Sequence, residues 1–467
     1  MAVIATSCAN SPAATGHAGT MIGPTALGVN VSSWDSTYTG AGVTPINDQL
    51  RSADLRLLRY PGGSWADEYN WITNADSSRC IGEVNTACST PDSIGFELYS
   101  MQARAAGAST FVTVNYGSGT PTEAAQWVAH AKSANGDAVN LWEVGNESYS
   151  CYETNYHLGG SPTFVRGYAP GGAVCPSTTV MARSYAANSV AYLKAMKQAS
   201  PTARIGVPWA FSGTEAAGAG VTDAMSWNRT VLQAVHSQVS FVDAHWYPFD
   251  TVKGVTDQQV LHSIGRIPAA ARRIRSTLDR FAPKAAFVVG ETNISERPTT
   301  LDFEPVSALF AAATSLEWLV VGAGTVDWWD LNNFGTPTTG DFGLVSSGPP
   351  ETQPAGAPLP PYYGEKLASM LTLPGSHLQN ATTGSSALIG FTSDLGSQRR
   401  VLLINSDDSR KAMMSPTWFR RGTDLRIATY SASSAATPSP ITQTTVRSDQ
   451  PVSVPAQSIV VLSGNPR

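Results

Sequence analysis

Short apolar runs alternate with longer stretches of helical periodicity from about residue 24 to residue 335. The runs are rich in Val, Leu, Ile and aromatic residues, which is typical of parallel strands that are buried on both faces. There are eight of them: Ala26–Val31, Leu55–Tyr60, Thr110–Asn115, Asn140–Gly145, Ile205–Trp209, Phe241–Trp246, Ala285–Gly290 and Gly324–Trp329. The pattern therefore predicts a sheet of eight parallel strands.

Helical patterns lie between these strands. Apolar residues recur about every 3.6 positions in three clear cases: a segment that starts at Pro121, Met181–Ala199 and Val260–Phe281. Eight strand–helix units in about 310 residues fit a (β/α)8 barrel. An open doubly wound sheet is the alternative, but no Gly-x-Gly-x-x-Gly motif follows the first strand.

The composition changes after Pro349. A proline-rich stretch, Pro349–Pro361, precedes a last helical pattern at Tyr363–Leu373. From His377 onward the chain contains short alternating strands separated by Ser, Thr and Gly: Ala387–Thr392, Arg400–Asn405, Asp424–Tyr430, Thr442–Val446 and Ser458–Ser463. This pattern predicts an antiparallel β-sandwich, to which the residues before Ala26 could add a strand.

The predicted fold class is thus α/β, a TIM barrel with a C-terminal sandwich. We divide the chain into a disordered or strand-donating segment, the catalytic barrel, a proline-rich connector with the last helix, and the sandwich: residues 1–23, 24–348, 349–376 and 377–467. Hydrophobic residues make up 42% of the chain and charged residues 14%, so a large core can form.

The charge pattern excludes several classes of partner. The net charge is -5 and no basic stripe is present, which argues against nucleic-acid binding. No apolar run approaches the roughly 18 residues that a membrane-spanning helix needs. Because the sequence has no Cys/His cluster, we predict no zinc site, and we expect no other metal or cofactor. The oligomeric state stays open.

The chain has five cysteines, and their spacing indicates the redox state of the compartment in which the protein folds. Cys80 and Cys88 flank one short stretch, and Cys151 and Cys175 flank another, which predicts two local disulfides and an oxidising compartment. Cys8 is expected to be a free thiol. The small, polar residues at the start of the chain resemble a lead-in that remains after signal removal, so we predict secretion. Four free thiols in a cytosolic protein are the alternative.

Two carboxylates emerge at the end of predicted strands. The fourth strand ends in Gly-Asn-Glu, with Glu147 last, and the seventh ends at Glu291. Barrel enzymes place reactive groups at the carboxyl ends of strands, so these side chains can face each other across the mouth. Cleavage of a glycosidic bond needs such a pair. A separation of ~5 Å implies retention of configuration, and ~6.5–9.5 Å implies inversion.

The motifs resemble those of retaining glycosidases of the large barrel clan with catalytic glutamates on strands four and seven. The segment from Leu58 to Ser64, Leu-Arg-Tyr-Pro-Gly-Gly-Ser, and the following Tyr69-Asn70-Trp71 are similar to a segment of α-L-arabinofuranosidases. Trp-Glu-Val-Gly-Asn-Glu and Gly-Glu-Thr also resemble the heparanase and β-glucuronidase family. The resemblance extends to the trailing sandwich, which these families share.

The resemblance implies roles for individual residues. Glu147 is expected to be the acid/base and Glu291 the nucleophile. Asn146 would bind the sugar hydroxyl beside the reacting carbon, and Arg59 would pair with Glu291 and keep it ionised. Four further residues at or near strand ends are candidates for substrate contact: Ser64, Asn115, His245 and Tyr247.

Aromatic residues near strand ends fit a platform for sugar rings. Flat apolar sugar faces stack on such rings. The candidates are Trp65, Trp209, Trp246, Trp328 and Trp329, although strand alternation turns only one of the last two toward the barrel interior. The loop from Tyr149 to Pro176 follows Glu147 and is expected to wall the pocket.

Two departures from the arabinofuranosidase pattern leave the sugar open. That family has an acidic residue early after strand one, where this chain reads Val-Asn-Val-Ser-Ser-Trp-Asp from Val29 to Asp35, and Ser64 replaces its Asn after Gly-Gly. A β-glucuronidase or β-xylosidase on the same scaffold is one alternative, but only Arg59 and Arg166 are candidates to bind a uronate. A non-catalytic carbohydrate-binding protein is the other alternative.

Overall fold

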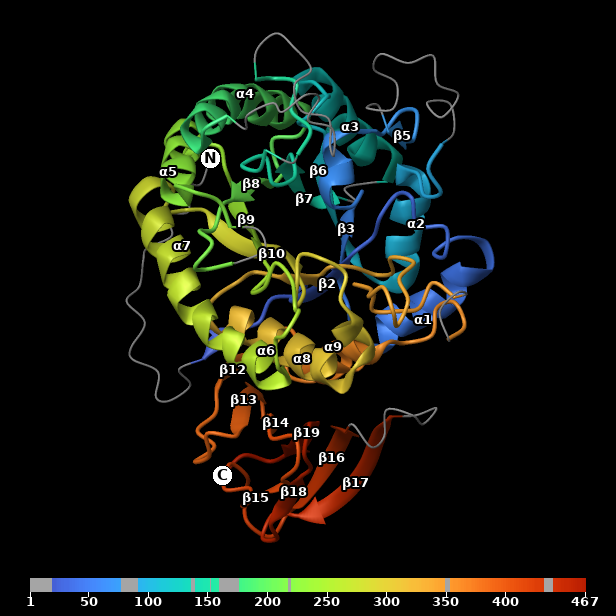
Figure 1. The fold of residues 1–467 in the computed structure, drawn as a ribbon, viewed down its shortest axis with the longest axis vertical. Helices are drawn as coiled ribbons and strands as arrows, with labels where there is room; N and C mark the ends of the chain where they lie inside the picture. The colour runs from blue at the N-terminus through green and yellow to red at the C-terminus, as the bar shows by residue number, and fades with distance from the viewer. Residues whose placement is uncertain are drawn as a thin grey trace, which may run out of the picture.

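A closed barrel of eight parallel strands forms the larger part of the molecule (Figure 1). The computed structural model describes residues 19–76, 91–135, 139–151, 153–158, 176–216, 220–348, 353–431 and 440–467. The barrel strands are β2 (Leu27–Asn30), β3 (Leu57–Tyr60), β6 (Ser109–Val114), β7 (Val139–Val144), β8 (Ile205–Trp209), β9 (Phe241–Trp246), β10 (Ala286–Thr292) and β11 (Val326–Trp328). All eight predicted strands are confirmed, and β11 pairs with β2 to close the ring.

The barrel interior is built in layers. Leu57, Phe111, Leu141, Phe241 and Val288 form an apolar cluster of their own. Side chains two positions further along a strand point to the same face. Polar residues therefore follow this cluster toward the carboxyl ends of the strands, and they form the floor of the site described below: Arg59, Thr113, Glu143 and Asp243.

Helices surround the barrel. They are α1 (Val43–Ser52), α2 (Phe96–Ala106), α3 (Pro121–Asn135), α4 (Thr178–Ala199), α5 (Ala224–Val235), α6 (Asp257–Ser263), α7 (Ile267–Phe281), α8 (Pro305–Val320) and α9 (Pro360–Ser369). The helix predicted at 260–281 is two helices, because a 3-10 turn at Ile264–Arg266 separates α6 from α7. Pro268 explains the new start, since proline is favoured in a first helical turn.

The C-terminal domain is an unequal sandwich. One sheet has the order β1-β12-β13-β14-β19-β16-β17, and the other pairs β15 with β18. Their bounds are β1 (Thr20–Met21), β12 (His377–Asn380), β13 (Leu388–Leu395), β14 (Gln398–Asn405), β15 (Ala412–Met414), β16 (Asp424–Ser431), β17 (Ile441–Arg447), β18 (Val452–Val454) and β19 (Ser458–Gly464). One apolar cluster, which includes Val401, Leu425 and Val454, joins the two sheets.

The large sheet packs on the barrel through its other face (Figure 1). Tyr430 of β16 stacks on Tyr363 of α9, with ring centroids 5.7 Å apart. Thr20 in β1 donates a hydrogen bond to the carbonyl of Val320 at the end of α8. The segment before the barrel thus adds an edge strand to the C-terminal sheet, as the sequence allowed.

Candidate active site

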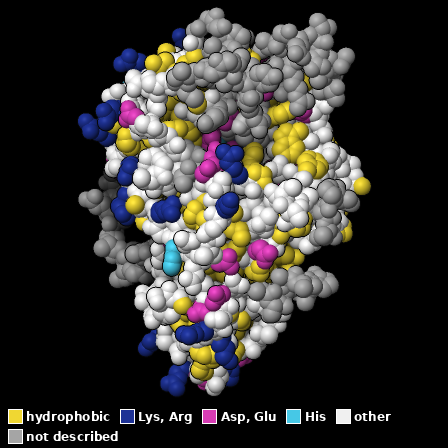
Figure 2. Space-filling model, viewed as in Figure 1, with side chains coloured by type: hydrophobic (Ala, Val, Ile, Leu, Met, Phe, Trp, Pro, Cys, Tyr) yellow, Lys and Arg dark blue, Asp and Glu magenta, His cyan; other side chains and the backbone are white. Residues whose placement is uncertain are grey.

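A cavity of about 700 Å³ opens at the carboxyl ends of the barrel strands. Glu147 and Glu291 both line it. Its other lining residues include five of the sequence candidates: Ser64, Trp65, Asn146, Tyr247 and Trp329. In Figure 2, acidic side chains gather near the middle of the barrel face, beside hydrophobic ones. The structure therefore brings the two glutamates into one cleft.

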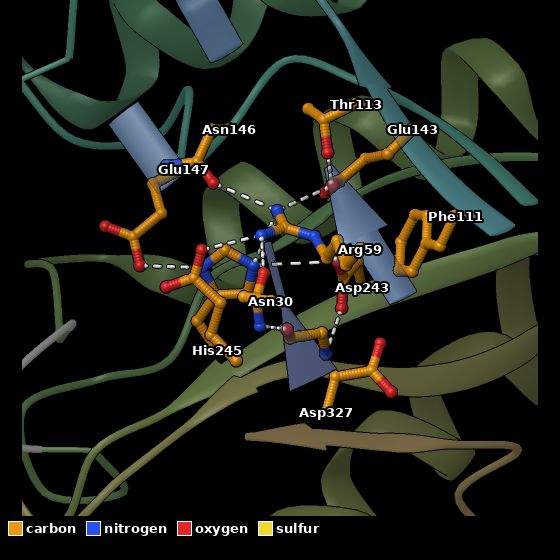
Figure 3. Close-up of polar contacts among 12 residues, drawn as sticks. Asn30, Arg59, Phe111, Thr113, Glu143, Asn146, Glu147, Asp243, His245 and Asp327 are labelled. Atoms are coloured by element: carbon orange, nitrogen blue, oxygen red, sulfur yellow. Dashed lines mark hydrogen bonds and ion pairs between the residues drawn. The ribbon is translucent and has the colours of Figure 1, made fainter. Parts of the chain in front are cut away.

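Arg59 lies at the centre of the polar floor below this cavity (Figure 3). It extends from the end of β3 and is 1% exposed. Its Nη1 donates to Glu291 Oε1 at 2.7 Å, and its Nη2 donates to Asn146 Oδ1 at 3.0 Å. One rigid guanidinium thus fixes the carboxylate on β10 relative to the residue that precedes Glu147.

Glu291 is held at both oxygens. Arg59 binds Oε1, and the hydroxyl of Tyr247 donates to Oε2 at 2.7 Å. Burial, together with the charge of Glu291, raises the pKa of Tyr247 well above its usual value, so this hydroxyl keeps its proton. Two donors therefore hold Glu291 at both oxygens and orient it at the cavity that it lines.

Glu147 follows β7 and has an unusual backbone. Its φ is +40°, in the left-handed region that few non-glycine residues adopt. Its Oε1 lies 2.9 Å from His245 Nδ1, and the pKa of the neighbouring Tyr149 is raised well above its usual value by burial and by the charge of Glu147. Carboxylate oxygens of Glu147 and Glu291 and a ring nitrogen of His245 all lie within 4.8 Å of one another.

His245 is buried between acidic groups. Burial alone would lower its pKa, but the charge of Glu291 and hydrogen bonds to Asp243 and Glu147 raise it well above the usual value. A charged imidazolium is therefore favoured there. Its Nδ1 faces Glu147 at 2.9 Å and Glu291 at 3.5 Å, so one ring contacts both carboxylates.

Two buried acids of the floor were missed by the sequence analysis. Glu143 Oε2 accepts hydrogen bonds from Arg59 Nη2 and Thr113 Oγ1, both at 3.0 Å, while its Oε1 has no partner. Burial, then the charge of Asp243, raises the pKa of Glu143 to about 8. Asp243 Oδ2 lies 3.5 Å from Arg59 Nε. An acid inside an otherwise apolar strand was the available signal.

Two groups of three residues in the site have ligand atoms at the spacing that a metal ion requires. One group is Glu147, His245 and Glu291, and the other is Glu143, Asp243 and His245. The guanidinium of Arg59 contacts Glu143, Asp243 and Glu291, so a side-chain cation already neutralises charge in this cluster. The expectation that no metal takes part stays a prediction.

The Gly62-Gly63 turn gives the cavity its wall. Gly62 has a φ of +109°, and a Cβ there would lie 2.4 Å from Ser32 Oγ. Gly63 has a φ of +49°, and its Cβ would lie 2.6 Å from the ring of Trp329. Both glycines are therefore required for the close approach of neighbouring loops. Next to them, Ser64 Oγ donates to Glu153 Oε1 at 2.8 Å within the cavity lining.

Arg59 and His245 belong to the floor below the cavity, and four other sequence candidates lie outside the cavity lining: Trp209, Trp246, Trp328 and Asn115. Trp209 and Trp246 are both buried. Trp328 is fully buried, donates from Nε1 to the carbonyl of Phe342 and packs against α8, so the predicted sugar contact is wrong for Trp328. Trp329 is the member of the pair that lines the cavity. The amide of Asn115 bonds to the Tyr69 carbonyl and to Ser118, so this residue organises a loop.

The loop after Glu147 lies partly in the described residues. Tyr149, Ser150 and Glu153 line the cavity, as expected. Most of the rest, including Arg166 and Cys175, lies outside the described residues, as do Cys8, Cys80 and Cys88. The two disulfides therefore stay predictions. Within the part of the chain that the structure describes, no helix is both long and apolar enough to cross a membrane.

Two curated proteins match a short part of the chain, and no family model matches it. An intracellular exo-α-L-arabinofuranosidase of Bacteroides ovatus is 29% identical over 128 residues, which are 23% of this chain and 25% of the relative. A probable α-L-arabinofuranosidase C of Aspergillus flavus is 24% identical over 124 residues, with the same two coverages. The chain thus matches about a quarter of the length of these relatives.

Solved structures match along almost the whole chain. The α-L-arabinofuranosidase of Thermotoga maritima, in an arabinose complex, has a TM-score of 0.68 at 13% identity and covers 96% of this chain and 97% of its own. The family 51 arabinofuranosidase of Xanthomonas axonopodis has a TM-score of 0.65 at 16% identity, with coverages of 95% and 97%. A family 44 endoglucanase of Clostridium thermocellum has 0.60 at 14%, with coverages of 96% and 97%. These likenesses establish the fold, a barrel followed by a β-sandwich.

Proposed function

We propose that this protein is a retaining glycoside hydrolase of the arabinofuranosidase type. The observation that carries the proposal is the distance of at most 4.8 Å between carboxylate oxygens of Glu147 and Glu291 in one cavity. Retaining enzymes hold their two carboxyl groups ~5–5.5 Å apart, whereas inverting enzymes need ~6.5–9.5 Å to admit a water. The similar solved arabinofuranosidases support the assignment through the fold.

The reaction proceeds in two displacements. Glu291 attacks the anomeric carbon and forms a covalent ester, while Glu147 gives its proton to the departing glycosidic oxygen. A water then attacks the same carbon, Glu147 takes its proton, and the bond to Glu291 breaks. The sugar leaves with its original configuration, since the carbon is inverted twice.

The surrounding residues prepare this chemistry. Arg59 and Tyr247 each donate to one oxygen of Glu291, so the nucleophile is oriented before substrate binds. Asn146 accepts from Arg59 through Oδ1, which leaves its Nδ2 available to donate to a sugar hydroxyl. Arg59 lies on β3, Asn146 follows β7 and Tyr247 directly follows β9.

The charge of the cavity favours a neutral sugar over a uronate. Glu147, Glu153, Glu291 and Glu296 all line it. Among the described lining residues Arg297 is the only cation, and it pairs with Asp250 at 3.1 Å. A uronate would need an unpaired cation there. This observation argues against the β-glucuronidase alternative.

Secretion, which the N-terminal composition suggests, belongs to the proposal.

The test combines a substrate panel with product analysis. The purified protein is assayed on 4-nitrophenyl α-L-arabinofuranoside and on the corresponding xyloside, glucoside and glucuronide, and proton NMR identifies the first anomer released. We expect hydrolysis of a neutral glycoside with retention. Glu291→Gly should be inactive and regain turnover with azide, while Glu97→Gln, at an exposed acid on α2, should match the wild type. Inversion, or full activity of Glu291→Gly, would overturn the nucleophile role, and no hydrolysis at all would overturn the function.

A further inference from the structure

Three of the six aromatic side chains that line the cavity come from the loops after β2 and β11, on the half of the mouth opposite Glu147. Trp34 lies in the loop after β2, and Trp329 and Phe342 lie in the segment after β11. All three line the cavity. The ring of Phe334, also after β11, lies 5.9 Å from that of Trp34 at an interplanar angle of 44°. The aromatic lining therefore continues from the cavity out to Phe334.

Phe334 combines an exposed aromatic side chain with a left-handed backbone conformation. Its side chain is 46% exposed, and its φ of +57° lies in the left-handed region, which costs energy for a bulky residue. Neighbouring side chains hold this backbone: the Phe334 amide donates to Ser347 Oγ at 2.9 Å, and the Gly335 amide donates to Asp341 Oδ2 at 3.1 Å. The loop thus fixes an exposed ring beside the cavity mouth.

The strand order tells which part of a substrate this ring would meet. The ring of strands runs β10-β11-β2-β3-β6-β7-β8-β9. Glu147 follows β7, which lies three strands from β2 and four from β11, on the opposite side of the mouth. Glu291 stands on β10, next to β11. Because the acid faces the leaving group, the half with Trp34 and Phe334 faces the sugar that becomes attached to Glu291.

We propose that Trp34 and Phe334 form a second glycone subsite, which binds a neutral sugar ring attached on the non-reducing side of the unit being cleaved. The proposal rests on the proposed hydrolase function and deepens it. Two rings from adjacent loops present apolar surface on which the flat face of a sugar can stack. The substrate is then an oligosaccharide or polysaccharide with at least two units on the glycone side.

The test compares substrates that differ by one glycone unit. Wild type is assayed on the 4-nitrophenyl glycosides of xylose and xylobiose, arabinose and arabinobiose, and glucose and cellobiose. In the series that it hydrolyses, we expect kcat/KM to be several-fold to about tenfold higher for the disaccharide, the range that one stacking contact supplies. Trp34→Ala and Phe334→Ala should each remove most of this preference, by lowering kcat/KM for the disaccharide more than for the monosaccharide.

Further variants separate stacking from folding. Phe334→Tyr keeps a ring and should retain the preference for the longer substrate. Ile72→Ala, at a hydrophobic residue that is 62% exposed after β4 (Tyr69–Asn70), is the matched control and should behave as wild type on both lengths. Equal losses on both lengths in Phe334→Ala, or no length preference in the wild type, would overturn the subsite while leaving the hydrolase intact. A wild type that hydrolyses none of the six glycosides would overturn both.

Discussion

The hydroxyl of Tyr247 donates to Oε2 of Glu291 at 2.7 Å, on the oxygen that Arg59 leaves free. Tyr247→Phe removes one charge-assisted donor from the nucleophile. Such a bond contributes about 1.5–3 kcal/mol, so kcat/KM should fall roughly 10- to 100-fold. Tyr192→Phe, which loses a bond to the Asn115 carbonyl instead, is the control. An unchanged kcat/KM in Tyr247→Phe would contradict the role.

Glu147 should behave as a proton donor whose importance depends on the leaving group. Glu147→Gln cannot give a proton, so hydrolysis of natural substrates should fall about 10²- to 10⁴-fold. Aryl glycosides with an acidic phenol need little protonation, and their first step should be nearly spared. Steady-state rates on dinitrophenyl and alkyl glycosides measure the difference. Similar losses on both would remove Glu147 from the acid role.

Glu143 should act through Arg59. With a pKa raised to about 8, the Glu143 carboxyl is mostly protonated at neutral pH. The neutral amide of Glu143→Gln resembles this protonated carboxyl, so the variant should keep most of the wild-type turnover at neutral pH. Glu143→Ala leaves Arg59 Nη2 without this partner and should lose at least about tenfold in kcat.

The pH profile separates this positioning role from a purely structural one. Above pH 8, ionised Glu143 competes with Glu291 for Arg59, so kcat/KM of the wild type should fall more steeply than that of Glu143→Gln. The other charged groups that face Glu143 are Asp243 and His245 on β9. Parallel profiles for the wild type and the Gln variant would rule the role out.

Glu365 links pH to stability far from the site. It lies on α9, accepts a hydrogen bond from Ser315 and is fully buried, and burial raises its pKa from 4.5 to about 8. Between these pH values the folded chain holds a proton that the unfolded chain has released, so stability falls as pH rises. Glu365→Gln cannot ionise, and its Tm should drop less than that of the wild type between pH 5 and pH 8. Thermal unfolding tests this, with Glu97→Gln as control; equal drops would count against it.

The sequence predicted the barrel because its strands are buried on both faces and read as continuous apolar runs. It also placed Arg59, Glu147 and Glu291 at one rim, since strand ends of a parallel barrel meet there. It could not decide between Trp328 and Trp329, because alternation shows opposite directions without showing which is inward.

Other features of the site were beyond sequence patterns. Glu143 and Asp243 lie within apolar strands, and their function as partners of Arg59 depends on the ring order of three strands. Phe334 and Trp34 come together from loops about 300 residues apart, through a backbone conformation that no motif marks. The break between α6 and α7 was overlooked because both helices share one apolar stripe.

Strand β1 precedes the barrel in the chain and pairs with β12, which follows the barrel, so one sheet contains both flanking segments. Thr20 and Met21 pair with Leu378 and His377, and Gln457 reaches back to Asp257 at the start of α6. The segments that enter and leave the barrel therefore pair with each other in a single sheet. Separating the domains would first require breaking the pairing of β1 with β12, so calorimetry should record one cooperative melting event. A fragment cut before residue 377 should expose the apolar flank of α8 and α9 and aggregate.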